Sequence, residues 1–300
     1  MSQIWVVGEV LIDLIPRGTD SKPIVGGGPA NTAKALSKLG IDTQFIDGIS
    51  TDDYGQMAKG ALVSAGVKLD YVKHSDKPTC LAIISLSDSG SASYEFVIEN
   101  TATFDFNVAW LPNPQTEQPA LLHIGTLATA IEPGASVLFE WAQSVAKVAP
   151  IVFDPNIRPA VISDRKQYLM QVERWVSISL AVKVSDEDIK WLYPNLEILQ
   201  VVNNWLAKGP SLIVVTYGDK GLAGYRVGEK VFVDAVKVLV ADTVGAGDTV
   251  GAILVEAIVK DGLDTLSGVR LEMMLKRAAK AAAITVSRSG ANPPTLKEIE

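Results

Sequence analysis

The sequence predicts an α/β protein in which a mostly parallel sheet is covered by helices on both faces. Short β-branched runs alternate with stretches whose apolar residues recur at helical spacing along most of the chain. No internal repeat, low-complexity tract or Pro-rich linker divides the 300 residues. We therefore expect one domain over residues 1–300, large enough to bury a sizeable core.

The first third of the chain sets this alternation. Residues 4–15 are β-rich, and residues 29–40 have helix-period apolar positions that end in a glycine. A second strand, 43–50, precedes a second helix, 54–66, which again closes on a glycine.

Four further strands follow, separated by helical stretches. They are predicted at 119–125, 149–154, 180–185 and 210–218. Ligands in open α/β sheets bind at the carboxyl ends of such strands, so polar residues there are candidates for a binding site.

One region breaks the alternation. Residues 78–100 contain two alternating strands around a Ser/Asp/Gly turn with no helix between them, which predicts an antiparallel hairpin. Together with residues 10–25 it would form a small β-lid over one edge of the main sheet, spanning roughly 10–25 and 78–105.

Composition narrows the partners and the compartment. The net charge is −7 with no basic run, which disfavours nucleic acid and anionic membranes. The single cysteine, Cys80, rules out an internal disulfide and is expected as a small buried residue on a strand. The N-terminus lacks the pattern of a signal peptide, and no apolar run is long enough to span a bilayer, so we expect a cytoplasmic protein.

The stretch "DTVGAGD", residues 242–248, follows a strand-like run and precedes a predicted helix. Gly245 and Gly247 let the backbone approach a ligand, and free N–H groups at a helix start bind anions. The third glycine, Gly251, comes too late for a dinucleotide fingerprint, and no Lys-Ser/Thr follows as in a Walker A loop. Taken alone, Asp248 could equally be a helix N-cap.

Three more stretches carry polar residues beside predicted strand ends. "VGGGPANTA" (25–33) places Asn31 in the first turn of a helix, where it could be no more than a helix-start residue. Asp13 lies at the end of an otherwise apolar first strand, where it could accept hydrogen bonds from two neighbouring sugar hydroxyls or face water. "FDPNIRP" (153–159) brings Arg158 close to a strand end, where a surface salt bridge is the alternative.

Together these motifs resemble the PfkB (ribokinase-like) family of carbohydrate kinases. In the family's order the chain shows "GEVLID", "GGGPANTA", "GISTDDYG", "DPNIRP", "VSDED", "VVTYGDKG", "DTVGAGDTVGA" and "SRSGA". The likeness covers nearly the whole chain and is greatest to bacterial fructokinases, with 2-keto-3-deoxygluconate kinases next. It implies a ribokinase-like three-layer sandwich with a small antiparallel β-lid.

The resemblance also implies a mechanism. Asp248 would take the proton from a sugar hydroxyl, and the backbone N–H groups of Gly245, Ala246 and Gly247 would bind the transferring phosphoryl group. Phosphoryl transfer needs mainly positioning and electrostatic stabilisation, which this small set can supply.

Further roles are carried over residue by residue. The expected sugar-binding residues are Asp13, Gly27, Gly28, Asn31 and Arg158. The expected nucleotide-binding residues are Ser185, Thr216, Gly218, Gly221, Gly247, Gly290 and Ala291. Asp188 would act on Mg²⁺ through water, and Asp242 would bind a monovalent cation such as K⁺. In "VSDED", Ser185 and Asp188 replace the Asn and Glu that many relatives carry.

The substrate is expected to be ATP plus a small neutral sugar, most simply fructose. Between residues 78 and 146 there is no Lys or Arg, so the lid hairpin has no cation for an acidic sugar such as 2-keto-3-deoxygluconate, which leaves Arg158, Arg17 or a partner subunit to supply one. A non-catalytic sugar- or nucleotide-binding regulator is the alternative of another class, although the base and the glycines are all present. A nicotinamide oxidoreductase fits poorly, because "VVGEVLID" has one glycine followed by acidic residues.

Two expectations complete the set. Lid strands would pair across a homodimer, because exposed sheet edges are usually covered. His74 and His123 have no Cys or Glu at ligand spacing, so we expect surface or core positions for them and not a metal site.

Overall fold

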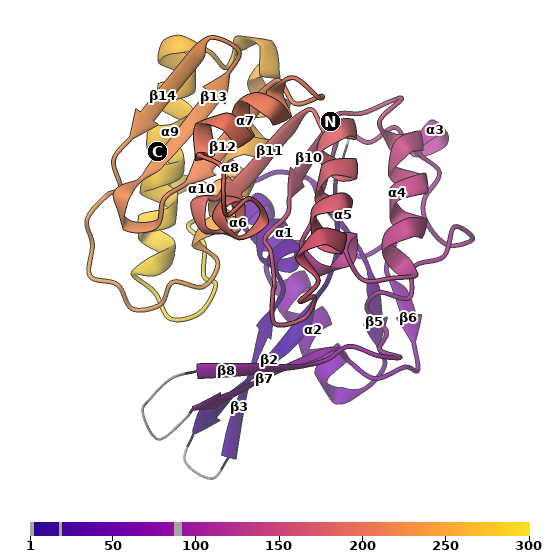
Figure 1. Cartoon of the computed structure of the whole chain (residues 1–300). Helices are drawn as coiled ribbons and strands as arrows, with labels where there is room; N and C mark the ends of the chain where they lie inside the picture. The colour runs from indigo at the N-terminus through magenta and orange to yellow at the C-terminus, as the bar shows by residue number, and fades with distance from the viewer. Residues whose placement is uncertain (1–2, 18–19, 87–91) are drawn as a thin grey trace.

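The computed structural model describes residues 3–17, 20–86 and 92–300. Its main sheet has eight strands in the order β14-β13-β12-β11-β10-β9-β1-β4 (Figure 1). The strands β4, β1, β9, β10, β11 and β12 pair in parallel with one another in this order. β13 pairs antiparallel with both β12 and β14. Their bounds are β1 Ile4–Val7, β4 Thr43–Ile46, β9 Leu121–Gly125, β10 Ile151–Asp154, β11 Ala181–Ser185, β12 Leu212–Thr216, β13 Leu222–Arg226 and β14 Glu229–Val233.

Helices cover both faces of this sheet, as predicted. Side chains alternate across β1: Ile4 and Val6 join one core cluster, while Trp5 and Val7 join the other. The cluster around Ile4 includes α1 Gly28–Lys38, α2 Asp53–Ser64, α8 Ala246–Asp261 and α9 Gly268–Val286. The cluster around Trp5 includes α4 Gly134–Val145, α5 Arg165–Ile178, α6 Asp186–Leu192 and α7 Ile198–Leu206. The short helices α3 Pro114–Glu117 and α10 Leu296–Ile299 complete the set. The three-layer α/β class is confirmed.

A smaller, four-stranded sheet projects from one edge of this body (Figure 1). Its order is β3-β2-β7-β8, with bounds β2 Leu11–Arg17, β3 Asp20–Gly26, β7 Leu81–Leu86 and β8 Ala92–Val97. β7 and β8 pair antiparallel, which confirms the predicted hairpin, although its turn lies outside the described residues. Cys80 is free and fully buried immediately before β7.

Two predicted strands are each divided between sheets. The run 4–15 breaks at Gly8, whose φ is 139° and whose position would bring a Cβ within 2.4 Å of Pro29 Cγ. Asp13 therefore lies within β2 of the small sheet, inside the region predicted for the lid, and the expectation that it ends the first strand was wrong. The run 43–50 likewise divides into β4 and β5 Gly48–Ser50, which pairs with β6 Lys73–Ser75.

Within the described part of the chain, no helix combines the length and apolarity needed to cross a membrane.

Candidate active site

A cavity of about 560 Å³ opens at the carboxyl ends of β10, β11 and β12. Six of the predicted site residues line it: Arg158, Ser185, Asp188, Thr216, Gly218 and Gly247. Parallel strands bring these distant segments to one edge of the sheet, where α6 and α8 also begin.

The N-terminus of α8 is shaped by its glycines. Gly245 is the N-cap with φ 82°, and a Cβ there would lie 2.7 Å from Ala291 Cβ. A Cβ on Gly247 would lie 2.8 Å from Lys183 Nζ. The backbone N–H groups of Gly245 and Gly247 have no backbone acceptor among the described residues. The helix start therefore offers free donors, together with the positive end of the helix dipole, to an anion.

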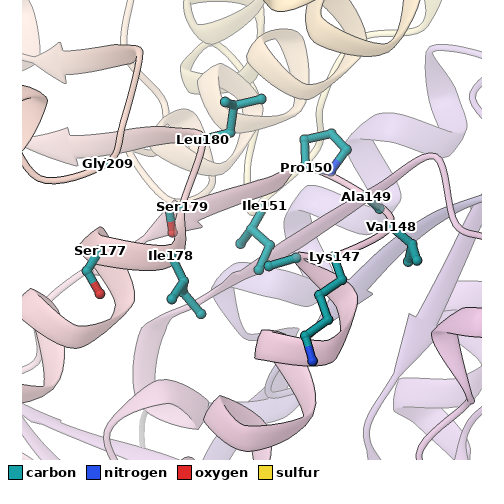
Figure 2. A pocket seen from close by; sticks show the side chains of 11 residues that line it. Lys147, Val148, Ala149, Pro150, Ile151, Ser177, Ile178, Ser179, Leu180 and Gly209 are labelled. Carbon is teal, nitrogen blue, oxygen red and sulfur yellow. The ribbon is translucent and has the colours of Figure 1, made fainter.

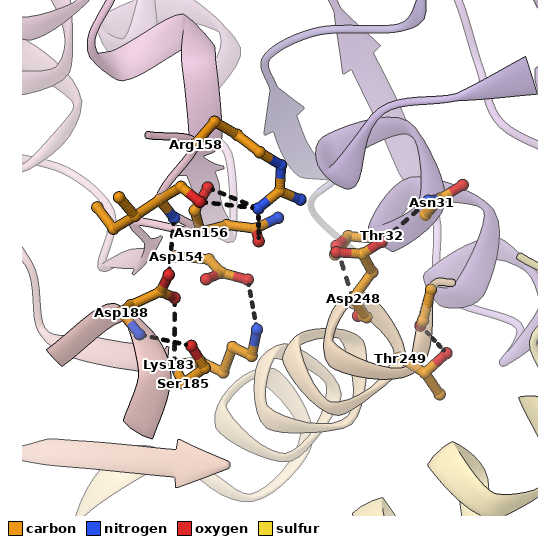
Figure 3. A network of polar contacts seen from close by, with 12 residues as sticks. Asn31, Thr32, Asp154, Asn156, Arg158, Lys183, Ser185, Asp188, Asp248 and Thr249 are labelled. Carbon is orange, nitrogen blue, oxygen red and sulfur yellow. Dashed lines mark hydrogen bonds and ion pairs between the residues drawn. The ribbon is translucent and has the colours of Figure 1, made fainter. Parts of the chain in front are cut away.

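Asp248 lies in the first turn of α8 and is 8% exposed. The Asn31 side chain donates to its Oδ2 at 2.9 Å, which joins α1 to α8 (Figure 3). Burial raises the pKa of Asp248 to about 6, although the Lys183 ammonium opposes this shift. Asp248 is not an N-cap, since Gly245 occupies that position. The carboxylate is thus held next to the free donors, and its raised pKa suits a general base.

The glycines before α1 leave room beside this carboxylate. A Cβ on Gly28 would lie 3.0 Å from Asn156 Nδ2 and 3.3 Å from Asp248 Oδ1. Gly27 has φ 102° and passes so close to Glu9 that a Cβ would meet its carbonyl oxygen at 2.3 Å. The backbone can make this approach only with glycine at both positions.

Asp13 marks the end of the site that faces the small sheet. A Cβ on Gly26 would lie 2.1 Å from Asp13 Oδ2. Burial raises the pKa of Asp13 to about 6, and the positive charges of Arg158 and Lys34 oppose this rise. Burial in turn lowers the pKa of Lys34, which lies on α1, to about 8. Asp13, Arg158 and Lys34 are therefore electrostatically coupled.

Arg158 and Asp188 are tied to the loop after β10. Arg158 Nη1 donates to Asn156 Oδ1 at 2.7 Å and to the Ile157 carbonyl oxygen at 3.0 Å. Asp188 Oδ1 accepts from the Ile157 N–H at 3.0 Å, and Asp188 and Ser185 cap α6 reciprocally. Burial and the nearby Asp154 raise the pKa of Asp188. Asp188 thus holds the loop that carries Arg158, and its water-mediated contact with Mg²⁺ stays a prediction.

The remaining predicted residues surround this centre. Asp242 accepts from the Val244 N–H at 3.0 Å and from the Gly290 N–H at 2.9 Å, so it joins the two loops that border the start of α8. Gly221 lies outside the cavity lining: its φ is 123°, and a Cβ would lie 2.1 Å from the Val233 carbonyl oxygen. That close approach gives Gly221 a clear structural role beside β14.

Lys183 and Glu9 were not identified from the sequence, and Asp154 was noted only as a residue at a strand end. Lys183 Nζ pairs with Asp154 Oδ2 at 2.9 Å, and both side chains are almost fully buried (Figure 3). Glu9, directly after Gly8, is 3% exposed and accepts bonds from the Thr126 hydroxyl and the Ala128 N–H. A lysine inside an otherwise apolar strand, as in "LAVKVS", was a signal that could have revealed Lys183.

The two histidines lie apart. His123 is a core residue of β9 with 1% exposure, and neither ring nitrogen has a hydrogen-bond partner among the described residues. Burial lowers its pKa to about 4, so the ring is neutral at physiological pH. His74 lies exposed on β6.

A second cavity, of about 470 Å³, lies at the opposite edge of the sheet (Figure 2). It is lined by the segment between α4 and β10, the segment between α5 and β11, and Gly209. None of the predicted site residues lines it.

Comparisons with known proteins agree with this arrangement. Residues 1–298 match the family model described as pfkB family carbohydrate kinase. A fructokinase of Rhizobium leguminosarum bv. trifolii is 35% identical over 267 residues, which cover 87% of this chain and 81% of that protein.

Solved structures of fructokinases share this fold. A fructokinase of Xylella fastidiosa with bound ATP is 24% identical, covers 99% of this chain and 96% of its own, and superposes with a TM-score of 0.91. A fructokinase double mutant of Vibrio cholerae O395, in a form with fructose, ADP and potassium ion bound, is 25% identical. It covers 97% of this chain and 94% of its own, with a TM-score of 0.84.

Proposed function

The chain belongs to the pfkB family of carbohydrate kinases, and from this premise we propose that it phosphorylates fructose with ATP to give fructose 6-phosphate. One observation carries the proposal: Asp248 is positioned by Asn31 at a helix start where the N–H groups of Gly245 and Gly247 have no backbone acceptor among the described residues. That arrangement supports a role for Asp248 as the base for the attacking alcohol, beside a binding site for the phosphoryl group.

The reaction follows from these positions. The Asp248 carboxylate accepts the proton of the sugar hydroxyl while the hydroxyl oxygen forms a bond to the γ-phosphorus. The bond from the γ-phosphorus to the β,γ-bridging oxygen breaks, and ADP leaves. The N–H groups of Gly245 and Gly247, with Ala246 between them, stabilise the charge on the transferring group. A pKa of about 6 leaves Asp248 ionised at neutral pH and more basic than an ordinary aspartate.

Substrate contacts are assigned by position. Asp13, Gly27, Gly28 and Asn31 would bind the sugar, and Arg158 would lie at its junction with the phosphates. The nucleotide would occupy the cavity lined by Ser185, Thr216 and Gly218, with Gly290 and Ala291 nearby and Gly221 supporting the turn.

Metal ions would be held at this edge mainly by the substrate, because the described residues include no group of three or more His, Cys, Asp or Glu that could hold one. Mg²⁺ binds chiefly through substrate phosphates and keeps several waters. Each oxygen of Asp188 accepts one N–H bond and retains a lone pair for such a water. We assign Asp242 to a monovalent cation, and the potassium ion in the Vibrio cholerae structure favours that assignment. Mg²⁺ would neutralise charge on the phosphates.

An acidic sugar such as 2-keto-3-deoxygluconate is the second candidate substrate. Lys34 and Arg158 both act electrostatically on Asp13, so the sugar end has two cations that come from outside the small sheet. The fructokinase relatives favour fructose.

Two wider proposals concern the whole molecule. The small sheet would close as a lid over the bound sugar and exclude water, and its edge strands β3 and β8 would pair in a homodimer. The single buried thiol suits a reducing cytoplasm.

A coupled ADP-release assay with Mg-ATP tests the function. Fructose, 2-keto-3-deoxygluconate, ribose, tagatose and nucleosides are compared, with Asp248→Asn beside the wild type. We expect fructose-dependent turnover, and a fall in kcat of about 10²–10⁴-fold in the variant, the usual contribution of a general base. Turnover on the acidic sugar alone would select the second candidate. An Asp248→Asn variant with wild-type kcat would rule out the assigned base.

A further inference from the structure

Lys183 is a lysine inside the central sheet. It lies on β11 among apolar residues, and its side chain is 5% exposed. Lysine is almost never buried to this degree unless a partner compensates its charge.

Asp154 is that partner, at the end of the neighbouring strand β10. The Lys183 Nζ to Asp154 Oδ2 distance is 2.9 Å, and the Asp154 side chain is 2% exposed. An ammonium has three N–H donors, and Asp154 is the one hydrogen-bond acceptor of Lys183 Nζ among the described residues. Buried ion pairs of this kind are weak evidence for a stabilising role, because desolvation offsets the attraction between the charges.

The ammonium extends to the start of α8. A Cβ on Gly247 would lie 2.8 Å from Lys183 Nζ, and both residues line the cavity at the carboxyl edge. Figure 3 shows the Lys183–Asp154 pair on one side of the start of α8, with Asp248 and Asn31 on the other. The two spare donors of Lys183 are therefore beside the N–H groups assigned to the phosphoryl group.

We propose that Lys183 is a catalytic residue whose ammonium donates hydrogen bonds to the transferring phosphoryl group, while Asp154 is a positioning residue that aims it. This inference rests on the proposed kinase function. No bond to Lys183 forms or breaks: it remains protonated and offsets the negative charge that gathers on the phosphoryl oxygens in the transition state. Burial lowers its pKa, but the carboxylates of Asp154 and Asp248 outweigh burial and raise the pKa overall, so the charge is retained.

The competing explanation is a structural ion pair that only fills the space under α8. Single variants do not separate the two, because Lys183→Met leaves Asp154 buried without its partner, which is strongly destabilising. The double variant Lys183→Met/Asp154→Leu replaces both charged groups with apolar side chains of similar size, a change that buried pairs often tolerate well. Its stability should therefore recover whichever explanation holds, whereas its activity depends on which is correct.

The experiment measures Tm, kcat and the KM for ATP for the wild type, Lys183→Met, the double variant and Lys147→Met. Lys147 is the matched control, since it lines the cavity at the other edge of the sheet. We expect the double variant to regain a Tm near that of the wild type while kcat stays about 10²–10³-fold low, the loss typical of one oxyanion-hole donor. The KM for ATP should change much less than kcat.

Recovery of kcat together with Tm would overturn the proposal and leave the pair as structural. A well-folded Lys183→Met variant with wild-type kcat would overturn it as well. If the wild type turns over none of the sugars, the kinase function itself fails, which is a different outcome from either of these.

Discussion

The two cavities lie at opposite edges of one sheet and have similar volumes, about 560 and 470 Å³, yet their linings differ sharply. Eight of the fifteen residues around the carboxyl-edge cavity carry a charge, whereas Lys147 alone among eleven does so at the amino edge. Size therefore does not distinguish the active site from an ordinary surface hollow.

The direction of the helices explains the difference. The helices α6 and α8 begin at the carboxyl edge, so their unpaired N–H groups and positive dipole ends face that cavity. The helices α4, α5 and α7 end near the other cavity and present carbonyl groups there. A βαβ architecture thus makes one edge suited to phosphate and leaves the other unsuited to it.

Among the changes that test this contrast between the cavities, the largest effect is expected from adding a methyl group beside Lys183. Gly247→Ala would place a Cβ 2.8 Å from Lys183 Nζ, so it should displace the ammonium or the N–H groups and lower kcat about 10²-fold. Gly60→Ala is the control: that glycine lies within α2 with nothing within 4 Å, and alanine should raise stability by up to about 1 kcal/mol. Steady-state kinetics and thermal melts check both, and an unimpaired Gly247→Ala enzyme would refute the tight fit.

Low pH should inactivate the enzyme by protonating carboxylates at the carboxyl edge. Burial raises the pKa of both Asp248 and Asp13 to about 6, and each must be ionised to accept a proton or a hydroxyl bond. As the pH falls below about 6, kcat/KM should drop about tenfold per unit for one group, and more steeply where both titrate. A pH profile of kcat/KM from pH 5 to 8 measures this. An activity that stays flat down to pH 5 would contradict these raised values.

A stability change should follow from Glu9, a buried carboxyl at the same edge. Burial raises its pKa from 4.5 to about 7, so the folded state favours the protonated form. The resulting stabilisation is complete below pH 4.5 and is lost as the pH rises through about 7. Glu9→Gln imitates the neutral form, so its Tm should match the wild type near pH 4.5 and exceed it by a few degrees near pH 8. Thermal melts of both proteins at about pH 4.5 and pH 8 test this. A Tm advantage of Glu9→Gln that shrinks as the pH rises would contradict the prediction.

The smallest effect is expected at the amino edge. Lys147→Met removes the one charge that lines that cavity, and kcat and KM should stay within about twofold of the wild type, as for surface changes away from special features. A tenfold or greater loss of kcat would show that the two edges are functionally linked. It would contradict the conclusion that only the carboxyl edge serves catalysis.

The alternation of strands and helices was predictable because each element depends on a local pattern of apolar residues. The strands 119–125, 149–154 and 180–185 agree with β9, β10 and β11 within two residues. The break at Gly8 was not predictable, because β1 and β2 are both apolar and their separation depends on contact with Pro29. Their partners, β9 and β7, are distant in the sequence.

The sequence by itself determined the layered class and the glycine-rich helix start beside Asp248, because helix starts and glycine turns depend on neighbouring residues. Only the tertiary structure decided that Asn31 holds Asp248, that Asp188 anchors the loop carrying Arg158, and that Lys183 lies beside Gly247. Each of these contacts joins segments that only the packing of the sheet and its helices brings together. Their charges act strongly on one another because that packing removes water from between them.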